Sequence, residues 1–139
     1  DLRRSCGADY TSNIDPPSYP DGLDVECFTA MSLQRALTEA QKTSEREHVT
    51  LWMRGDASGL RQANLRAIAD ASAVRLTVDY PDDLLAIRAL LAHLPANGQF
   101  DWFDLLRVMQ QAPELAALNL HQRNEGLAKS LAADIKEMP

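Results

Sequence analysis

Residues 74–94, VRLTVDYPDDLLAIRALLAHL, contain the change of sequence pattern that decides the fold. Apolar and polar side chains alternate through residues 74–78, which is the period-two pattern of a half-buried strand. Pro81 then suits the first turn of a helix, because its missing N–H costs nothing at that position. We therefore expect a strand that ends at Asp79 and is followed at once by a helix.

The expected helix carries a stripe of apolar side chains at helical spacing: Leu84, Ile87, Leu91 and Leu94, with Leu85 and Leu90 beside them. In open α/β sheets, ligands bind at the edge where the carboxyl ends of strands meet the following helices. Asp79 is therefore expected at a ligand-binding edge.

Composition limits the class of protein. The 139 residues are 45% hydrophobic and 24% charged, as in an ordinary globular domain. The formal net charge of −6 indicates no basic surface for nucleic acid or an anionic membrane, and no apolar run is long enough to span a bilayer. No signal peptide is visible, so we expect a cytoplasmic protein in which Cys6 and Cys27 are buried free thiols.

Periodicity and turn chemistry predict the remaining elements. Strands are expected at residues 8–13 and 23–29, separated by a proline-rich loop, and a weaker one at 65–69. Helices are expected at residues 30–42, 44–53 and 81–94, and from Asp101 and about Asn124 onward. Leu33, Ala36, Leu37 and Ala40 form the apolar face of the first helix, and Leu127, Leu131 and Ile135 that of the last. Together these elements predict an α/β fold with three to four strands and about five helices.

Two of these helices carry recognisable N-terminal caps. Ser44–Glu47 reads as a capping box, in which the hydroxyl of the serine and the carboxylate of Glu47 each accept an orphan backbone N–H. Asp101 can cap the helix that follows it.

Asp79 has two open interpretations. A carboxylate at the carboxyl end of a strand can hold a hard cation such as Mg²⁺ through its oxygens. Alternatively, Asp79 caps the following helix, because Tyr80 occupies the N-cap position and cannot serve as a cap.

Asp24 and Glu26 project from one face of the strand expected at 23–29. Two carboxylates about 4 Å apart at a protein surface repel each other by roughly 4 kcal/mol at an effective dielectric constant near 20. Such a pair needs water, an arginine, a metal or a polar ligand beside it. A solvated strand surface and a ligand-facing pair both remain open.

Further ionisable groups gather at two helix starts. Glu45, Arg46 and His48 surround one start, where a solvated face is the ordinary interpretation. Arg123 and Asn124 form either a capped helix entry or a hook that binds an anion. The sequence contains no glycine-rich phosphate loop, no CxxC and no GxSxG, so no nucleophilic triad is indicated.

Five blocks stand in a specific order along the chain: YPDGLDVECF at 19–28, SEREHVT at 44–50, RLTVDYPDDLLAIRALL at 75–91, FDWFDLLRVM at 100–109 and LNLHQRNEGLAKSL at 118–131. Together they resemble the C-terminal half of the acylneuraminate cytidylyltransferase-like family, in particular its members similar to spore coat polysaccharide biosynthesis protein F. Because the chain begins within a pattern of a helix that leads into a strand, we expect residues 1–139 to be the C-terminal part of a single domain whose N-terminal, nucleotide-binding half is absent.

The resemblance implies a nucleotidyltransferase α/β sandwich similar to the Rossmann type. The implied activity is transfer of CMP from CTP to a sugar acid, with Mg²⁺ and release of pyrophosphate, in surface or spore coat polysaccharide biosynthesis. It implies Asp79 as the metal ligand and Asp24 and Glu26 as catalytic carboxylates on the sugar or metal side. It also places Glu45, Arg46 and His48 near the pocket. With Arg123 and Asn124, whose possible binding of an anion was noted above, these residues are the substrate-binding candidates.

The chain departs from the family pattern at three positions. The family usually has Pro where Leu51 stands, Thr or Ser where Tyr80 stands, and Tyr where Leu127 stands. The family's nucleotide-binding loop and its first metal-binding aspartate belong to the half that is absent. We therefore expect these 139 residues to bind CTP only weakly.

Two other classes remain open. An incomplete sheet leaves unpaired strand edges and exposed apolar area, which favours a non-catalytic module for oligomerisation or partner docking, and a homo-oligomer is expected in either case. An unrelated α/β domain that shares this turn chemistry by chance would lack a strand ending at Asp79.

Overall fold

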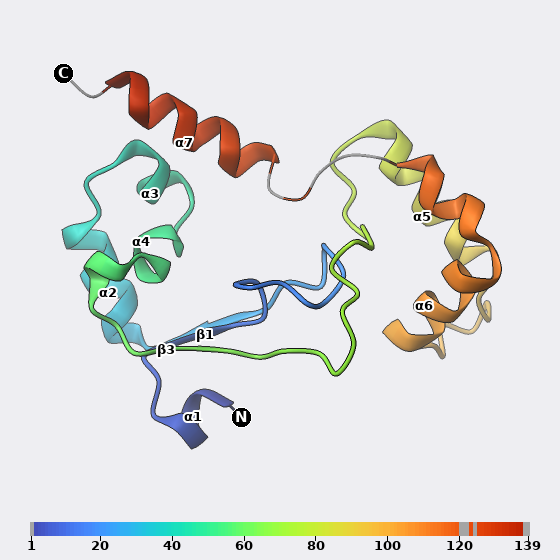
Figure 1. Cartoon of the computed structure of the whole chain (residues 1–139), viewed down its shortest axis with the longest axis horizontal. Helices are drawn as coiled ribbons and strands as arrows, with labels where there is room; N and C mark the ends of the chain where they lie inside the picture. The colour runs from blue at the N-terminus through green and yellow to red at the C-terminus, as the bar shows by residue number, and fades with distance from the viewer. Residues whose placement is uncertain (1, 120–122, 124, 138–139) are drawn as a thin grey trace. The chain divides into compact units, whose positions relative to one another are not determined.

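The structure is a computed structural model that describes residues 2–119, 123 and 125–137 (Figure 1). The backbone separates into two compact units. Of the described residues, unit 1 contains 2–19, 24–70 and 125–137, and unit 2 contains 20–23, 71–119 and 123.

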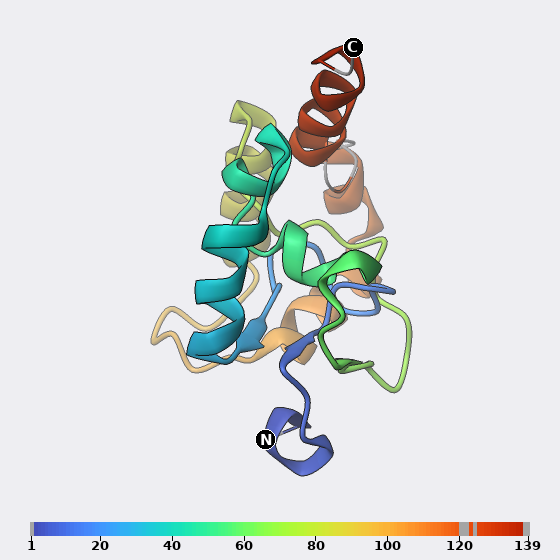
Figure 2. The same cartoon turned by 90° about the vertical axis from the view of Figure 1, so that its left-hand side faces the viewer.

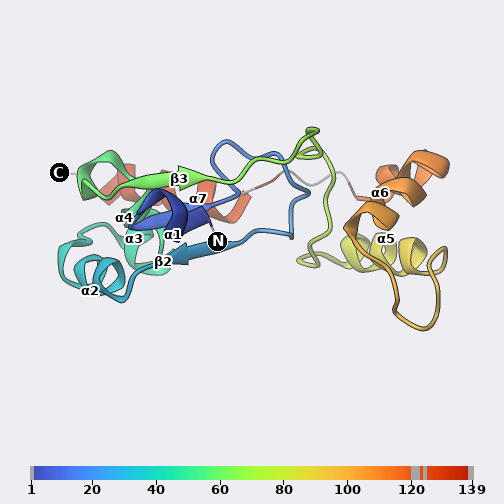
Figure 3. The same ribbon diagram turned by 90° about the horizontal axis from the view of Figure 1, so that it is seen from below.

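A three-stranded sheet lies in unit 1. Strand β1 (Tyr10–Ser12) pairs antiparallel with β2 (Glu26–Phe28) and parallel with β3 (Gln62–Asn64), so the order is β2-β1-β3 (Figure 3). Both strands predicted from sequence are present but shorter than expected: the one predicted at 8–13 forms only at Tyr10–Ser12, and the one predicted at 23–29 forms only in its second half. The third strand lies directly before the predicted range 65–69, because pairing with β1, and not a local apolar pattern, defines it.

Unit 1 also contains five α-helices among its described residues and one 3₁₀ turn: α1 (Leu2–Cys6), α2 (Ala30–Glu39), α3 (Thr43–Glu47), α4 (Leu51–Arg54), α7 (Glu125–Glu137) and η1 (Asp56–Ser58). The helix predicted at 44–53 is interrupted, because His48 takes a non-helical backbone conformation with φ −102° and ψ 82°. This interruption turns one predicted helix into α3 and α4.

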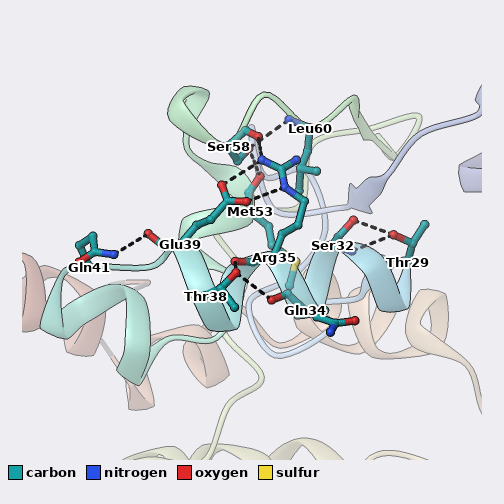
Figure 4. A network of polar contacts seen from close by, with 10 residues as sticks. All are labelled: Thr29, Ser32, Gln34, Arg35, Thr38, Glu39, Gln41, Met53, Ser58 and Leu60. Atoms are coloured by element: carbon teal, nitrogen blue, oxygen red, sulfur yellow. Dashed lines mark hydrogen bonds and ion pairs between the residues drawn. The ribbon is translucent and has the colours of Figure 1, made fainter.

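Helices α2 and α4 pack against the sheet and form the core of unit 1 (Figure 2). The buried side chains are Tyr10, Ala36, Ala40, Trp52 and Met53, with Phe28 and Leu60 packed against them. Arg35 links α2 to η1, because its Nη2 donates to the carbonyl oxygen of Ser58 at 3.0 Å (Figure 4). The core therefore includes only part of the apolar face predicted for residues 30–42.

The capping box predicted at Ser44–Glu47 is wrong. Helix α3 begins at Thr43, and the carboxylate of Glu45 accepts the backbone N–H of Lys42 at 3.2 Å. The hydroxyl of Ser44 donates instead to Asp134 of α7, which lies beside α3 (Figure 1). The hydroxyl of Ser44 therefore bonds to a residue distant in the chain, Asp134, and not to a backbone N–H of its own helix.

The prediction that both cysteines are buried is also wrong. Cys6 and Cys27 are free thiols, and both are exposed. Cys6 ends the short helix α1. Cys27 alternates with Glu26 and Phe28 along β2, so its side chain points away from the face that α2 and α4 cover.

Unit 2 contains α5 (Pro81–Leu91), α6 (Trp102–Gln111) and the 3₁₀ helix η2 (Pro113–Leu118). Its core consists of Leu90, Val108, Ala112 and Leu115. Asp101 caps α6 as predicted, because its Oδ1 accepts the backbone N–H of Phe103 at 2.9 Å and that of Asp104 at 3.1 Å.

The strand predicted at 74–78 is reduced to a single bridge, in which Arg75 pairs parallel with Asp21. The backbone N–H of Leu76 donates to the carbonyl oxygen of Asp21 at 2.7 Å. Gly22 permits this approach, because its φ is +99° and a Cβ there would lie 2.8 Å from the carbonyl carbon of Leu76. The alternation of apolar and polar side chains at 74–78 indicates a local preference for extended backbone. A longer strand would also need a longer pairing segment, which the described residues do not provide.

Helix α5 begins at Pro81 as predicted but buries a different face. Asp83, Ala86 and Leu90 are buried, whereas Leu85 and much of the predicted stripe face outward. The polar contacts of Asp83, described below, orient the helix in this way. Within the described part of the chain, no helix combines the length and apolar character that crossing a membrane requires.

The predicted α/β class is confirmed by the mixed architecture of three strands and several helices. The described α-helices exceed the predicted number, because α1 is counted as a helix of its own and the 44–53 helix is divided.

Candidate active site

A hollow of about 570 Å³ lies beside β2 in unit 1, and we call it the β2 hollow. It is lined by Ile14, Asp24, Glu26, Phe28, His48, Val49, Thr50 and Arg54. Strand β2 supplies Glu26 and Phe28, and the segment from the end of α3 through α4 supplies the residues from His48 to Arg54. The structure thus brings together Asp24, Glu26 and His48, three of the residues predicted from sequence.

Glu26 is held firmly on the wall of the β2 hollow. Its Oε1 accepts hydrogen bonds from the hydroxyl of Tyr10 at 2.5 Å and from the hydroxyl of Thr50 at 2.9 Å. Burial, together with the bond to Glu26, raises the pKa of Tyr10 far above its ordinary value, so the phenol remains a donor. A plain solvated strand surface therefore does not describe Glu26, whereas Asp24 is exposed at the rim.

Arg54 is the cation of the β2 hollow. Its Nε lies 3.9 Å from Oε1 of Glu26, which is too long for a hydrogen bond. Within the described residues, this buried Nε has no hydrogen-bond partner. Oε1 already accepts two hydroxyl hydrogens, so its lone pairs are committed elsewhere.

Sequence reasoning missed Tyr10, Thr50 and Arg54. The spacing of Thr50 and Arg54 contains a usable signal, because residues four apart lie on the same face of a helical turn. Tyr10 gives no such signal, since only the β1–β2 pairing places its ring beside the carboxylate of Glu26.

His48 contacts α7 as well as lining the β2 hollow. Its Nε2 lies 3.0 Å from Oγ of Ser130, and the same hydroxyl lies 2.8 Å from Oε2 of Glu47. A carboxylate on Nδ1 of the histidine would be needed for a catalytic triad, and Glu47 is instead 4.0 Å from Nε2. His48 is therefore a polar group at the edge of the hollow, anchored by α7.

Glu45 and Arg46 lie at a different place from His48. Both line a second hollow of about 170 Å³, the α2 hollow, whose other lining residues are Leu33, Ala36, Leu37, Ala40 and Val49. Glu45 is occupied in capping α3, and Arg46 is exposed. Their predicted role in substrate binding remains a prediction, but they do not share the β2 hollow with Asp24.

Asp79 belongs to unit 2, and its side chain is 64% exposed. Its Oδ2 accepts a hydrogen bond from Nη2 of Arg75 at 2.9 Å. The capping interpretation of Asp79 is wrong, because Oδ2 of Asp83 accepts the backbone N–H of Tyr80 at 3.1 Å and of Asp79 at 2.9 Å. The role of Asp79 as a metal ligand remains a prediction.

Asp83 is the centre of a buried polar network in unit 2. Its fully buried carboxylate accepts Nε and Nη2 of Arg75 at 3.0 and 2.9 Å, and Nδ2 of Asn119 at 3.0 Å. Arg75 holds the pKa of Asp83 far below its ordinary value, although burial opposes this shift. Arg75 also donates from Nη1 to Asp21 at 3.0 Å.

Sequence reasoning missed this network, because alternation places Arg75 on the outward face of a strand. The available signal was composition, since Arg75 is the single basic residue of the segment 71–87, which also contains the aspartates at 79, 82 and 83. Arg123 lies at the same network, with its Nε 3.4 Å from Oδ1 of Asp21. Asn124, predicted as its companion, lies outside the described residues.

The carboxylates of the described residues fit Mg²⁺ only if the cation is bound in an open site, in which few of its ligands come from the protein. Mg²⁺ commonly takes one or two protein carboxylates and completes its shell with water and substrate phosphates. The described residues contain no group of three or more His, Cys, Asp or Glu that could enclose a metal. A single exposed carboxylate such as that of Asp79 is compatible with the open form.

Comparison with known proteins supports the fold. No protein-family model matches the chain, and no curated protein matches it. Among solved structures, the chain is similar to a cytidylyltransferase from Leptospira borgpetersenii serovar Hardjo-bovis (strain JB197), with a TM-score of 0.77 and 20% sequence identity. The match covers 88% of this chain and 51% of that one, so the chain spans about half the length of the structure it resembles.

The chain therefore has the fold of part of a cytidylyltransferase. This likeness favours the predicted fold class over an unrelated α/β domain, even though residues 74–78 form only a single bridge.

Proposed function

We propose that the protein transfers CMP from CTP to a sugar acid and that this chain provides the acceptor side of the reaction. The observation that carries the proposal is the β2 hollow, where Asp24, Glu26, His48 and Arg54 converge. Carboxylates accept hydrogen bonds from sugar hydroxyls, and an arginine binds an acidic group on the same molecule. The likeness in fold to a cytidylyltransferase supports the choice of CTP as the second substrate.

The chemistry requires deprotonation of one acceptor hydroxyl. The hydroxyl oxygen attacks the α-phosphorus of CTP, and the bond from that phosphorus to the bridging oxygen of the β-phosphate breaks, releasing pyrophosphate. The hydroxyl proton passes to a carboxylate, for which Asp24 is the better candidate because it stands at the exposed rim. Glu26, already bonded by Tyr10 and Thr50, serves to orient the acceptor.

Asp79 is the residue that we propose to hold Mg²⁺, together with phosphate oxygens and water. The cation, when bound, neutralises negative charge that develops on the transferred phosphoryl group. Arg75, which contacts both Asp79 and the buried Asp83, fixes the direction of the Asp79 carboxylate. The product, a CMP-activated sugar acid, would serve the assembly of surface or spore coat polysaccharide.

The test is a pyrophosphate-release assay on the full-length protein with CTP, Mg²⁺ and a panel of sugar acids. We expect release that depends on both CTP and one acid. Asp24→Asn should lower kcat by about 10²- to 10⁴-fold, the usual contribution of a general base. Asp56→Asn, at an exposed position of η1, is the matched control and should leave kcat unchanged. Absence of release with every acid, from a folded protein, would reject the proposal.

A second candidate function is supported by the apolar side chains around the α2 hollow. Leu33 and Leu37 of α2, which line this hollow, are 42% and 69% exposed, and Val49 is 55% exposed. Exposed apolar clusters of this kind mark protein interfaces. A module that pairs chains without catalysis would use this surface and would leave the β2 hollow without a substrate.

A further inference from the structure

We propose that Ser130 of α7 fixes the ring hydrogen of neutral His48 on Nε2, and that Nδ1 of His48 is therefore a hydrogen-bond acceptor of the β2 hollow. Ser130, held by Glu47, is then a positioning residue that acts on the hollow through His48. That the hydroxyl bound by Nδ1 belongs to the acceptor sugar rests on the proposed function. The place of the ring hydrogen does not.

Ser130 has one hydroxyl hydrogen and two acceptors for it. Its Oγ lies 2.8 Å from Oε2 of Glu47 and 3.2 Å from the carbonyl oxygen of Gly126. An ionised carboxylate and a backbone carbonyl only accept hydrogen bonds. The hydroxyl therefore donates to one of these two oxygens, and the lone pairs of Oγ remain for a donor.

That donor is Nε2 of His48, which lies 3.0 Å from Oγ of Ser130. A bond in the reverse direction, from the hydroxyl to Nε2, would leave Oγ and the carboxylate of Glu47 2.8 Å apart with no hydrogen between them. A neutral imidazole carries a hydrogen on one nitrogen and a lone pair on the other. His48 therefore carries its hydrogen on Nε2 and its lone pair on Nδ1.

Two contacts one helical turn apart set the register of α7 against the end of α3 (Figure 1). Asp134 accepts the backbone N–H of Ser44 at 3.0 Å, and Ser130 lies on His48. Residues four apart share one face of a helix, so the first contact brings Ser130 to the ring of His48. The tautomer of His48 thus depends on how α7 is seated.

Nδ1 is the ring nitrogen of His48 that remains for a ligand. Within the part of the chain that the structure describes, the ring forms one hydrogen bond, the one to Ser130. The side chain is 30% exposed, and His48 lines the β2 hollow. A ligand in this hollow therefore meets a ring whose Nε2 is already bonded to α7.

An acceptor at Nδ1 suits the other groups of the hollow. Asp24 and Glu26 are anionic acceptors, and Arg54 is a cationic donor. Neutral His48 adds a third acceptor without a third negative charge. A volume of about 570 Å³ lies within the range of small-molecule sites, roughly 300–1,000 Å³. The hollow therefore suits a small molecule with several hydroxyl groups that donate hydrogen bonds.

The experiment identifies which nitrogen of His48 reacts with iodoacetamide in the intact protein. Alkylation takes place at the nitrogen that has the lone pair, and a histidine without a fixed ring hydrogen reacts mainly at Nε2, the less hindered nitrogen. The reaction is run at about pH 8.5, above the range in which histidine ordinarily titrates, after the exposed thiols of Cys6 and Cys27 have been blocked. We expect His48 to react mainly at Nδ1.

His93 is the internal control. Its Nδ1 lies 2.9 Å from the carbonyl oxygen of Ala89 and so carries the ring hydrogen. The nitrogen with the lone pair is therefore Nε2 in His93, and we expect His93 to react there.

Ser130→Ala should return His48 to reaction mainly at Nε2, whereas Ser130→Thr, which keeps the hydroxyl, should preserve reaction at Nδ1. His93 should react at Nε2 in both variants. In the pyrophosphate assay, Ser130→Ala should raise the KM for the acceptor by roughly two- to tenfold, the usual loss of one hydrogen bond, and leave the KM for CTP unchanged. The unaltered protein alone tests the place of the ring hydrogen if Ser130→Ala does not fold.

Reaction of His48 at Nε2 in the unaltered protein would overturn the inference, as would no reaction of His48 under conditions in which His93 reacts. An unchanged product or an unchanged acceptor KM in folded Ser130→Ala would also overturn it. The pyrophosphate assay separates this inference from the proposed function. Turnover with His48 alkylated at Nε2 rejects only the inference, whereas Ser130-dependent reaction at Nδ1 without turnover rejects only the proposed reaction.

Discussion

At the scale of single residues, Asp79 and Asp83 have identical side chains that contact the same arginine, Arg75, but they differ in how far they are exposed to solvent. Both accept a hydrogen bond of 2.9 Å from Nη2 of Arg75. Asp83 is fully buried, whereas the side chain of Asp79 is 64% exposed. Removing one partner of a buried ion pair leaves an uncompensated charge, but an exposed pair exchanges its partner for water at little cost.

Asp83→Asn should therefore lower the free energy of unfolding by about 3 kcal/mol, the usual cost of breaking a buried ion pair. Asp79→Asn, which contacts the same arginine, should lower it by less than about 1 kcal/mol and serves as the matched control. Urea denaturation of each variant measures the difference. Equal losses in the two variants would show that burial does not set the strength of these pairs.

Asp79→Asn in the full-length protein also tests the proposed metal ligand. We expect loss of Mg²⁺-dependent turnover with a nearly unchanged melting temperature, because Asp79 does not cap α5. Retained turnover per folded molecule would remove Asp79 from the mechanism.

The low pKa of Asp83 gives its contribution to stability a definite sign. The contact with Arg75 stabilises the ionised carboxylate in the folded chain. The full contribution is therefore present above the pKa of an unfolded aspartate, about 3.9, and is lost as the pH falls below that value. The unfolding free energy of Asp83→Asn should fall less steeply than that of the unaltered protein between about pH 4 and pH 2.

At the scale of elements, α7 is held to α3 by polar contacts. Asp134 accepts the backbone N–H of Ser44 at 3.0 Å and also its hydroxyl, and Ser130 lies 3.0 Å from His48. Two of the three apolar residues of the stripe predicted for this helix, Leu131 and Ile135, are 40% and 72% exposed, so most of the stripe is not buried. A helix attached mainly by hydrogen bonds is expected to open locally more readily than one buried by apolar side chains.

Asp134→Ala should release α7, because it removes both contacts to Ser44. Hydrogen exchange at the amides of residues 125–137 should accelerate, while exchange in β1 remains slow. Lys129→Ala, on the exposed side of the same helix, is the matched control and should leave exchange unchanged. The contacts with Ser44 lower the pKa of Asp134, so α7 should also loosen as the pH falls below about 4. Unchanged exchange in Asp134→Ala would mean that other contacts hold α7.

At the scale of the whole molecule, the exposed apolar side chains of α2 are the main argument for self-association. Leu33 and Leu37 are 42% and 69% exposed and line the α2 hollow beside Val49. Their burial against a second copy would use the part of the predicted apolar face that the core of unit 1 leaves uncovered.

Leu37→Glu should shift the mass measured by light scattering from an oligomer to a monomer, because a charge in an apolar contact is costly to desolvate. Gln34→Glu adds the same charge at another exposed position of α2 and is the control that should keep the oligomer. A monomeric unaltered protein would contradict the expected self-association directly.

The elements predicted correctly are those whose signals are local. The strand at Tyr10–Ser12, the helices that begin at Ala30 and Pro81, and the cap by Asp101 all follow from β-propensity, periodicity or capping chemistry within a few residues. The helix at 44–53 and the strand at 74–78 were predicted less well. A break at His48 and the limited pairing at Arg75 depend on backbone conformation and on partners elsewhere in the chain.

For the candidate site, the sequence by itself determined the chemistry of the groups: Asp24 and Glu26 as a carboxylate pair, His48 as a titratable neighbour and Asp79 after a strand-like stretch. Only the tertiary structure decided which partners these groups meet. Tyr10 and Thr50 donate hydrogen bonds to Glu26, Nε of Arg54 has no hydrogen-bond partner within the residues that the structure describes, and Asp83 takes the buried place on Arg75. The physical reason is that hydrogen bonds and ion pairs act over a few ångströms, and those distances are set by packing between segments that are distant in the chain.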